Sequence, residues 1–299
     1  MVYLKQQRPE KVTVPSLRGS KERGERLVCL TAYDYPTARI VDEAGTDIIL
    51  VGDSLGNVVL GYDSTVPVTL EEMLHHARAV RRGVERALLV ADMPYGTYHT
   101  GPEDAVRAAL RLVKEGGAEA VKLEGGRDRV ETVRRLVAAE IPVMGHLGLT
   151  PQSLNKLGSY RLQAKTADAA RALVEDALAL EEAGAFAVVL EVVPHEIARH
   201  VTAQLKIPTI GIGAGAGCDA QILVLHDMLG LSFSRTRPRF VREYAPLREH
   251  ITDAISRYAD DVRSGAFPSL DESYPLPADA AAQLDLAPSA GGDQQVEKS

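Results

Sequence analysis

Cysteine is scarce in this chain of 299 residues, where Cys29 and Cys218 are the only two and lie far apart. Two distant cysteines predict neither a disulfide framework nor a zinc site, both of which need several suitably spaced ligands. A protein without structural disulfides is typical of a reducing compartment. We therefore expect a cytoplasmic protein.

Long apolar runs and clusters of positive charge are also missing. No run approaches the roughly 18 apolar residues that a membrane-spanning helix needs, and the polar start MVYLKQQRPEK does not resemble a signal peptide. The formal net charge is −7, and basic residues gather only in short pairs such as Arg81-Arg82. The sequence therefore predicts neither a membrane protein nor a nucleic-acid-binding protein.

The composition is that of an ordinary globular protein, with 45% hydrophobic and 25% charged residues. Only the C-terminal part differs: from about Ser269 the chain is rich in proline, alanine, glycine and aspartate and poor in large apolar residues. Such a segment cannot bury enough apolar surface to offset the entropy lost on ordering. We therefore expect a single domain over residues 1–268 and a disordered tail over residues 269–299.

Eight short apolar runs are predicted to be buried β-strands, because they are nearly continuous and do not alternate with polar residues. These runs span residues 28–33, 47–52, 87–91, 118–123, 142–146, 185–190, 208–212 and 222–225. Amphipathic stretches of helical period lie between them, at residues 71–83, 102–116, 127–140 and 167–183. Strands and helices therefore alternate along the chain.

Eight strands that each lead into a helix, over roughly 200 residues, are typical of an α/β fold of the (β/α)₈ TIM-barrel type. A short N-terminal helix is expected before the first strand, at the bottom of the barrel, and a C-terminal helical extension over residues 238–266. A doubly wound open sheet is the alternative. That fold normally carries a glycine-rich loop after the first strand, whereas this chain has TAYDYP there.

Four of the predicted strands end in a carboxylate, namely Asp53, Asp92, Glu124 and Glu191. The C-terminal ends of the strands form the active-site face of a TIM barrel. A single acid there is explained as well by a structural role, as a helix cap or a solvated loop residue, as by a functional one. Four converging acids, however, repel one another and need a cation. Carboxylate oxygens without histidine or cysteine suit Mg²⁺. Lys122, two residues before Glu124 and on the same strand face, adds a positive charge that suits an anionic substrate.

Several long motifs occur in order between about Val12 and Arg239, without large gaps, and read LTAYDYPTA, VGDSLGNVVLGYDSTVPVTLEEM, ADMPYGTY, VKLEGG, PVMGHLGLTPQS, VLEVVP and IPTIGIGAGAGCDAQILVLHD. Together they resemble the motifs of the ketopantoate hydroxymethyltransferase family. The resemblance implies a (β/α)₈ barrel that binds Mg²⁺ and assembles into a large homo-oligomer, in this family a decamer. It also implies transfer of a hydroxymethyl group from methylenetetrahydrofolate to α-ketoisovalerate (3-methyl-2-oxobutanoate), giving ketopantoate in pantothenate biosynthesis.

The resemblance also assigns residues. Asp53, Asp92 and Glu124 match the metal-site acids of the family, with Asp53 and Asp92 nearest the metal and Glu124 acting directly or through water. The expected substrate-binding residues are Asp53, Ser54, Asp92 and Lys122. Glu191 matches the catalytic base, which would remove a proton next to the ketone while Mg²⁺ stabilises the enolate. The sequence departs from the family at 158–164, GSYRLQA in place of GGYKVQG, which puts the folate contacts in doubt.

Some alternatives stay open at this point. His146, at the end of the fifth predicted strand, either polarises a substrate oxygen, helps the folate leave, or bonds a neighbouring loop. The segment GIGAGAGCDAQ is either a phosphate-binding loop or a tight turn at the barrel rim.

Two other functions remain to be weighed. A Mg²⁺-dependent lyase or mutase of the isocitrate lyase and phosphoenolpyruvate mutase type shares a ring of acids, but many such enzymes carry a cysteine in a KKCGH-like loop that this chain lacks. A non-catalytic metabolite-binding barrel is the other alternative, although binding alone needs no base.

Overall fold

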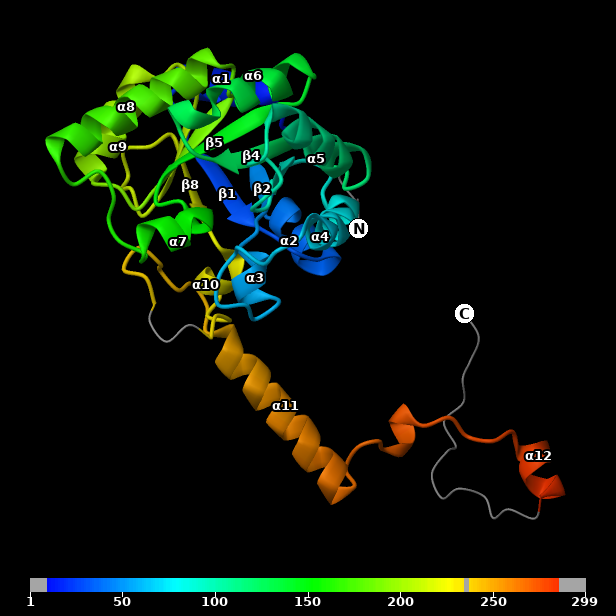
Figure 1. Cartoon of the computed structure of the whole chain (residues 1–299). Helices are drawn as coiled ribbons and strands as arrows, with labels where there is room; N and C mark the ends of the chain where they lie inside the picture. Colours follow the sequence, from blue (N-terminus) through cyan, green and yellow to red (C-terminus); the bar gives the residue numbers. More distant parts are fainter. Residues whose placement is uncertain (1–9, 234–236, 285–299) are drawn as a thin grey trace. The chain divides into compact units, whose positions relative to one another are not determined.

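The eight expected strands form one closed barrel, in which each strand pairs in parallel with its neighbours in chain order. The fold is described from a computed structural model that covers residues 10–233 and 237–284 (Figure 1). The strands are β1 (Leu27–Thr31), β2 (Ile48–Val51), β3 (Leu88–Asp92), β4 (Ala120–Glu124), β5 (Val143–Gly148), β6 (Ala187–Glu191), β7 (Thr209–Ile212) and β8 (Ala220–Leu223). The prediction of a (β/α)₈ barrel is therefore confirmed.

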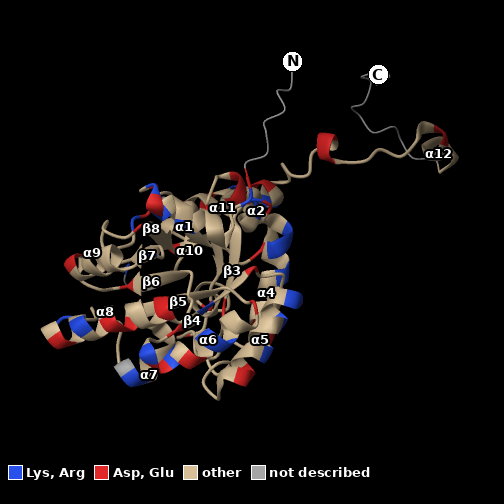
Figure 2. Cartoon of the chain, turned by 90° about the horizontal axis from the view of Figure 1, so that it is seen from above, with Lys and Arg blue, Asp and Glu red and all other residues tan. Residues whose placement is uncertain are grey.

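Helices surround the barrel and carry many of the charged residues on their outer faces (Figure 2). They are α2 (Tyr35–Glu43), α3 (Leu55–Val58), α4 (Leu70–Gly83), α5 (Pro102–Lys114), α6 (Val130–Ala138), α7 (Leu154–Leu157), α8 (Ala167–Glu182), α9 (His195–Gln204) and α10 (Leu225–Met228). The start of α4 shows why these segments are helical: Thr69 and Glu72 form a reciprocal capping box, with Glu72 N–H donating to Thr69 Oγ1 at 3.1 Å. None of the described helices is long and apolar enough to cross a membrane.

The inside of the barrel is apolar through its lower layers. Alternate strand residues point inward, and those of the lower layers form one buried cluster with members such as Leu50, Val90, Ala120 and Met144. The side chains on the other face pack against the helices in a second, larger cluster. The barrel is therefore a filled core, and polar inward-facing residues are confined to its upper end.

The expected N-terminal helix, α1 (Val14–Glu22), closes the bottom of the barrel. Leu17 of this helix is 1% exposed, and with Val12 it belongs to the same apolar cluster as the inward-facing strand residues. Val12 also donates its N–H to the carbonyl of Arg86 at 2.8 Å. Apolar contact and backbone pairing together fix this segment below the strands.

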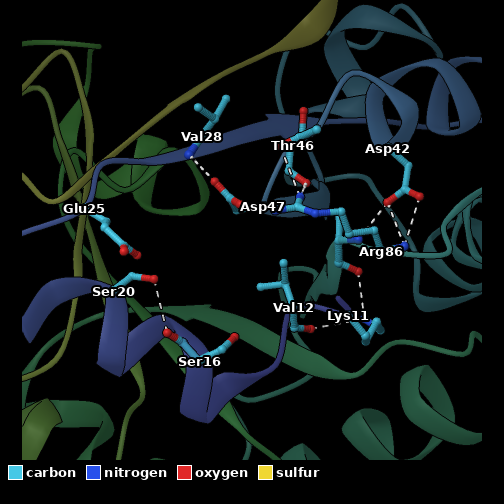
Figure 3. A network of polar contacts seen from close by, with 12 residues as sticks. Lys11, Val12, Ser16, Ser20, Glu25, Val28, Asp42, Thr46, Asp47 and Arg86 are labelled. Atoms are coloured by element: carbon cyan, nitrogen blue, oxygen red, sulfur yellow. Dashed lines mark hydrogen bonds and ion pairs between the residues drawn. The ribbon is translucent and has the colours of Figure 1, made fainter. Parts of the chain in front are cut away.

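A polar network ties the strand starts together at the same end (Figure 3). The Arg86 guanidinium donates to the Thr46 carbonyl and to Asp47 Oδ1, both at 2.8 Å, while Asp47 Oδ2 accepts the Val28 N–H at 2.9 Å. The carboxylate of Asp42 accepts the backbone N–H of Arg86 and of its neighbours on either side. The charged groups at the bottom of the barrel thus stabilise loops. In this role they differ from the acids at the C-terminal ends of the strands.

The chain divides into two compact units, residues 1–245 and 246–299. The second contains α11 (Leu247–Ser264), where the helical extension was expected, a short 3-10 turn (Leu270–Glu272) and α12 (Ala278–Gln283). None of the residues of α11 is buried. The sequence placed the boundary after residue 268, and the expected disordered tail falls partly outside the described residues, at 285–299.

Candidate active site

The strand register brings the polar residues of β3, β4 and β5 side by side. Asp92 is two residues beyond Val90 and therefore shares its inward-facing side, because side chains alternate along a strand. In the paired strands Asp92 stands opposite Lys122, and Glu124 stands opposite His146. The four side chains fill the upper end of the barrel, and each is at most 6% exposed.

Lys122 and Asp92 form a buried ion pair, with Nζ 2.7 Å from Oδ1. Burial lowers the pKa of Lys122, but the carboxylates of Asp92, Glu124 and Asp53 raise it by more, so that the pKa lies above its ordinary value. The lysine therefore keeps its proton at neutral pH. It is a fixed positive charge among several negative ones.

Asp53 follows β2 and reaches the same cluster through the backbone. Its N–H donates to Asp92 Oδ2 at 3.0 Å, and its own carboxyl is 5% exposed. Burial raises the pKa of Asp53 well above its usual range, and the charges of Asp92 and Glu124 raise it further, against the opposing effects of Lys122 and Gln152. The negative charge of three buried carboxylates is thus larger than one lysine can balance.

Gly52 is needed for this close approach. A Cβ at this position would lie 2.7 Å from Ser54 Oγ and 3.4 Å from Asp92 Oδ2. Ser54 in turn shares a hydrogen bond of 2.8 Å with the hydroxyl of the buried Tyr33. The hydroxyl of Ser54 is therefore held at the edge of the acid cluster, where glycine leaves room for it.

His146 links the cluster to Glu191, because each of its ring nitrogens faces a carboxylate. Nδ1 lies 3.3 Å from Glu124 Oε1, and Nε2 lies 3.1 Å from Glu191 Oε2. Burial and Lys122 lower the pKa of His146, but Glu124 and Glu191 outweigh them and raise it to about 9. The positive charge of an imidazolium suits two carboxylate neighbours. The alternatives considered from sequence did not include this bridging position.

Glu191 is the last residue of β6, and the backbone after it is unusual. Val192 has a φ of 49°, in the left-handed region that a β-branched residue rarely adopts. The segment is held by hydrogen bonds from Leu149 N–H to the Glu191 carbonyl and from Val192 N–H to the Ile212 carbonyl, both at 2.8 Å. The direction of the half-buried Glu191 side chain is therefore set by a constrained backbone.

Comparison with known proteins identifies the family. The family model for ketopantoate hydroxymethyltransferase matches residues 11–270. The chain belongs to this family. It is 54% identical over 276 residues to the 3-methyl-2-oxobutanoate hydroxymethyltransferase of Koribacter versatilis, covering 92% of this chain and 93% of that protein. It is 57% identical over 264 residues to the protein of the same name from Moorella thermoacetica, covering 88% of this chain and 98% of that protein.

Solved structures with the same fold include more distant enzymes. A 2,3-dimethylmalate lyase matches with a TM-score of 0.54 and 19% identity over 91% of this chain and 97% of the other. A phosphonopyruvate hydrolase in complex with oxalate and Mg²⁺ matches with a TM-score of 0.57 and 15% identity, over 91% and 95% of the two chains. At such identities the likeness supports the barrel fold alone.

Most of the residues expected from the sequence of this family member lie in one connected group. Contacts join Asp53, Asp92 and Lys122 directly. Glu124 is linked to Asp53 through Gln152, and Glu191 is reached through His146. Sequence reasoning missed three neutral partners, which are Tyr33, Tyr98 and Gln152. All three lie within the motifs that carry the family resemblance, so their place in those motifs was the available signal.

The acids are held by protein groups in this structure. Asp53 Oδ2 accepts from Gln152, Asp92 pairs with Lys122, and Glu124 accepts from the Gln152 N–H. Among the described residues, no three His, Cys, Asp or Glu side chains are grouped closely enough to form a metal-binding cluster. The expected Mg²⁺ site therefore stays a prediction.

The glycine-rich segment after β7 packs against α9 and the chain beyond β8. A Cβ at Gly215 would lie 2.4 Å from the Cβ of His195, and one at Gly217 would lie 2.8 Å from the Cβ of Arg199. The φ of Gly215 is 77°, which also favours glycine. These close contacts favour the tight turn over the phosphate-binding loop.

The charge arrangement predicts opposite effects for two isosteric substitutions. Asp53→Asn keeps an acceptor for Gln152 and removes one of three crowded charges, so the free energy of unfolding at pH 7 should stay the same or rise. Asp92→Asn leaves the buried Lys122 without its ion-pair partner, which should lower that free energy by about 3–5 kcal/mol. Urea denaturation of both variants in metal-free buffer measures the difference. Equal stability of the two variants would contradict the assigned charges.

Proposed function

We propose that this enzyme transfers a hydroxymethyl group from methylenetetrahydrofolate to α-ketoisovalerate and thereby forms ketopantoate. The observation that carries the proposal is identity of 54–57% to proteins named 3-methyl-2-oxobutanoate hydroxymethyltransferase over about nine-tenths of the chain. The polar cluster at the mouth of the barrel supports it, because it joins the expected acids, one lysine and the expected base.

The chemistry of the donor set suits a divalent cation. Asp53, Asp92 and Glu124 are at most 5% exposed, and burial, followed by the charges of Asp92 and Glu124, raises the pKa of Asp53 despite Lys122. An all-oxygen set with excess negative charge suits Mg²⁺, with Asp53 and Asp92 nearest and Glu124 acting directly or through water. When bound, the cation would supply Lewis acidity toward the ketoacid oxygens.

The carboxylate of the ketoacid would be bound by Lys122 and Ser54. Lys122 stays charged because surrounding carboxylates raise its pKa, and its Nζ lies among them at the upper end of the barrel. The hydroxyl of Ser54 is oriented by Tyr33 at 2.8 Å. The positive charge of Lys122 and the fixed hydroxyl of Ser54 would thus recognise an anion that the ring of acids alone would repel.

Glu191 would act as the general base. The C3–H bond of α-ketoisovalerate breaks, its proton passes to a carboxylate oxygen of Glu191, and C3 bonds to the one-carbon unit of the donor. The two C–N bonds of the donor's methylene carbon break, and water supplies the hydroxyl oxygen. The proton lost from C3 and one proton of the water end on the nitrogens of the tetrahydrofolate that leaves. His146, 3.1 Å from Glu191 Oε2, orients the carboxylate through a charged contact.

The competing functions are less well supported. A lyase or mutase with a catalytic cysteine would need a thiol in a loop at the strand ends. Here Cys29 is buried in β1, and Cys218 is buried close to Gly211. A binding protein would need no base next to the acid cluster. Exchange of the C3 proton of α-ketoisovalerate for deuterium in the absence of folate distinguishes the hydroxymethyltransferase from both.

Glu191→Gln tests the assignment of the base. The substitution keeps the size of the side chain and removes its basicity, so deuterium exchange should fall by roughly 10²- to 10⁴-fold, the range of general-base catalysis. Affinities for Mg²⁺ and ketoacid should stay within a few-fold of the parent. Proton NMR in D₂O with Mg²⁺ measures exchange, and calorimetry measures binding.

Glu196→Gln is the matched control, because Glu196 lies on the exposed first turn of α9, where it contacts His195. This variant should exchange at the parental rate. A Glu191→Gln enzyme that also exchanged at that rate would remove Glu191 from the reaction. A parent without any exchange would instead overturn the proposed activity.

We also propose that the chain forms a homo-oligomer, with a decamer as the size that the family resemblance implies. Within α11, the side chains of Ile251, Ile255, Tyr258 and Val262 follow one another at intervals of four, three and four residues. Each is 45–61% exposed, so the helix carries a continuous apolar stripe. Such a stripe is typical of a helix that packs against a second chain.

Ile255→Glu tests this assembly. A charge in the middle of the stripe should dissociate the oligomer, because it cannot be buried without a partner. Ser256→Glu, about 100° further round the helix, is the matched control and should keep the parental mass. Size-exclusion chromatography with light scattering measures both. A monomeric parent, or an Ile255→Glu variant of parental mass, would contradict the proposal.

A further inference from the structure

Gln152 connects two of the expected metal-site acids. It lies in the 3-10 turn Pro151–Ser153 after β5 and is 4% exposed. Its Nε2 donates to Asp53 Oδ2 at 2.8 Å and to the Met93 carbonyl at 2.9 Å, while its backbone N–H donates to Glu124 Oε2 at 3.1 Å. One residue therefore holds an oxygen of each acid.

Tyr98 fixes the orientation of the Gln152 amide. Its ring is 1% exposed, and its hydroxyl accepts the Glu124 N–H at 3.3 Å and donates to Gln152 Oε1. A tyrosine phenol carries its proton at neutral pH. A hydroxyl has one proton to donate, and it is committed to Oε1. The NH₂ group of Gln152 must therefore face Asp53.

The result is a directed chain of hydrogen bonds through the whole acid cluster. It runs from the Glu124 N–H to Tyr98, from Tyr98 to Gln152, and from Gln152 to Asp53. The Asp53 N–H continues it to Asp92, which is paired with Lys122. Both bridging side chains are uncharged, so they fix the carboxylates without neutralising them. A basic residue in the same place would compete with a cation.

We propose that Gln152, oriented by Tyr98, is a positioning residue that holds Asp53 and Glu124 for divalent-cation binding. The inference rests on the proposed function, in which these acids bind Mg²⁺. Each acid gives one oxygen to Gln152, which fixes the direction of its second oxygen. Groups that orient metal ligands in this way typically contribute 10- to 100-fold to metal affinity.

Two substitutions test the inference. Gln152→Leu keeps a similar volume and the backbone N–H but removes the amide, and Mg²⁺ affinity should fall about 10- to 100-fold. Tyr98→Phe removes one hydroxyl and frees the Gln152 amide to turn, so it should also lower the affinity for Mg²⁺. The double variant should be little weaker than Gln152→Leu alone, because the two groups act in series. Isothermal titration calorimetry with Mg²⁺ measures all four proteins.

The change in thermal midpoint on adding Mg²⁺ separates positioning from a purely structural role. A ligand stabilises the folded state according to its affinity, so weaker binding reduces the Mg²⁺-dependent rise. A structural defect would lower the midpoint equally with and without Mg²⁺ and leave the rise unchanged. Gln221→Leu is the control: Gln221 is exposed on β8 and donates to the Gly215 carbonyl, and this variant should behave as the parent.

The outcomes separate the two proposals. If the parent binds Mg²⁺ and both Gln152→Leu and Tyr98→Phe bind it as tightly, the positioning role is overturned and the proposed function stands. If the parent itself binds no Mg²⁺, the proposed metal site is wrong, and so is the inference that rests on it. Tyr98→Phe keeps the buried ring, so it supplies the test even if Gln152→Leu does not fold.

Discussion

Three carboxylates buried around one lysine are the constraint on which the rest of this structure depends. Only Asp92 pairs directly with Lys122, at 2.7 Å, whereas Asp53 and Glu124 are held by Gln152. Burial and repulsion raise the pKa of Asp53, because the protein groups alone do not balance the negative charge. A site built in this way favours a cation and, through Lys122, an anion that accompanies it.

The barrel makes this arrangement stable by separating apolar and polar layers. The same two-residue alternation that points Val90 into the apolar core places Asp92 above it, at the mouth. Salt bridges and capping interactions at the bottom, such as that of Arg86 with Asp47, hold the strand starts. The upper ends are thereby left to carry chemistry, as in other barrels of this type.

The sequence predicted the features that have a recognisable local pattern of residues. Continuous apolar runs revealed all eight strands, and charged residues at their ends revealed Asp92, Glu124 and Lys122 as one group. Neutral partners such as Gln152 gave no comparable signal, since an amide in a loop has no preferred spacing and its role depends on distant strands. The left-handed backbone at Val192 was equally invisible, because valine normally avoids it.

The most direct test of this account is the position of Mn²⁺, by anomalous diffraction, in crystals grown with α-ketoisovalerate. The account predicts a metal about 2.1 Å from oxygens of Asp53 and Asp92, with the ketoacid carboxylate within hydrogen-bonding distance of Lys122 and Ser54. Its C3 should face Glu191. A metal bound elsewhere, or a ketoacid bound with its C3 far from Glu191, would contradict the central claim that these strand-end acids form the catalytic metal site.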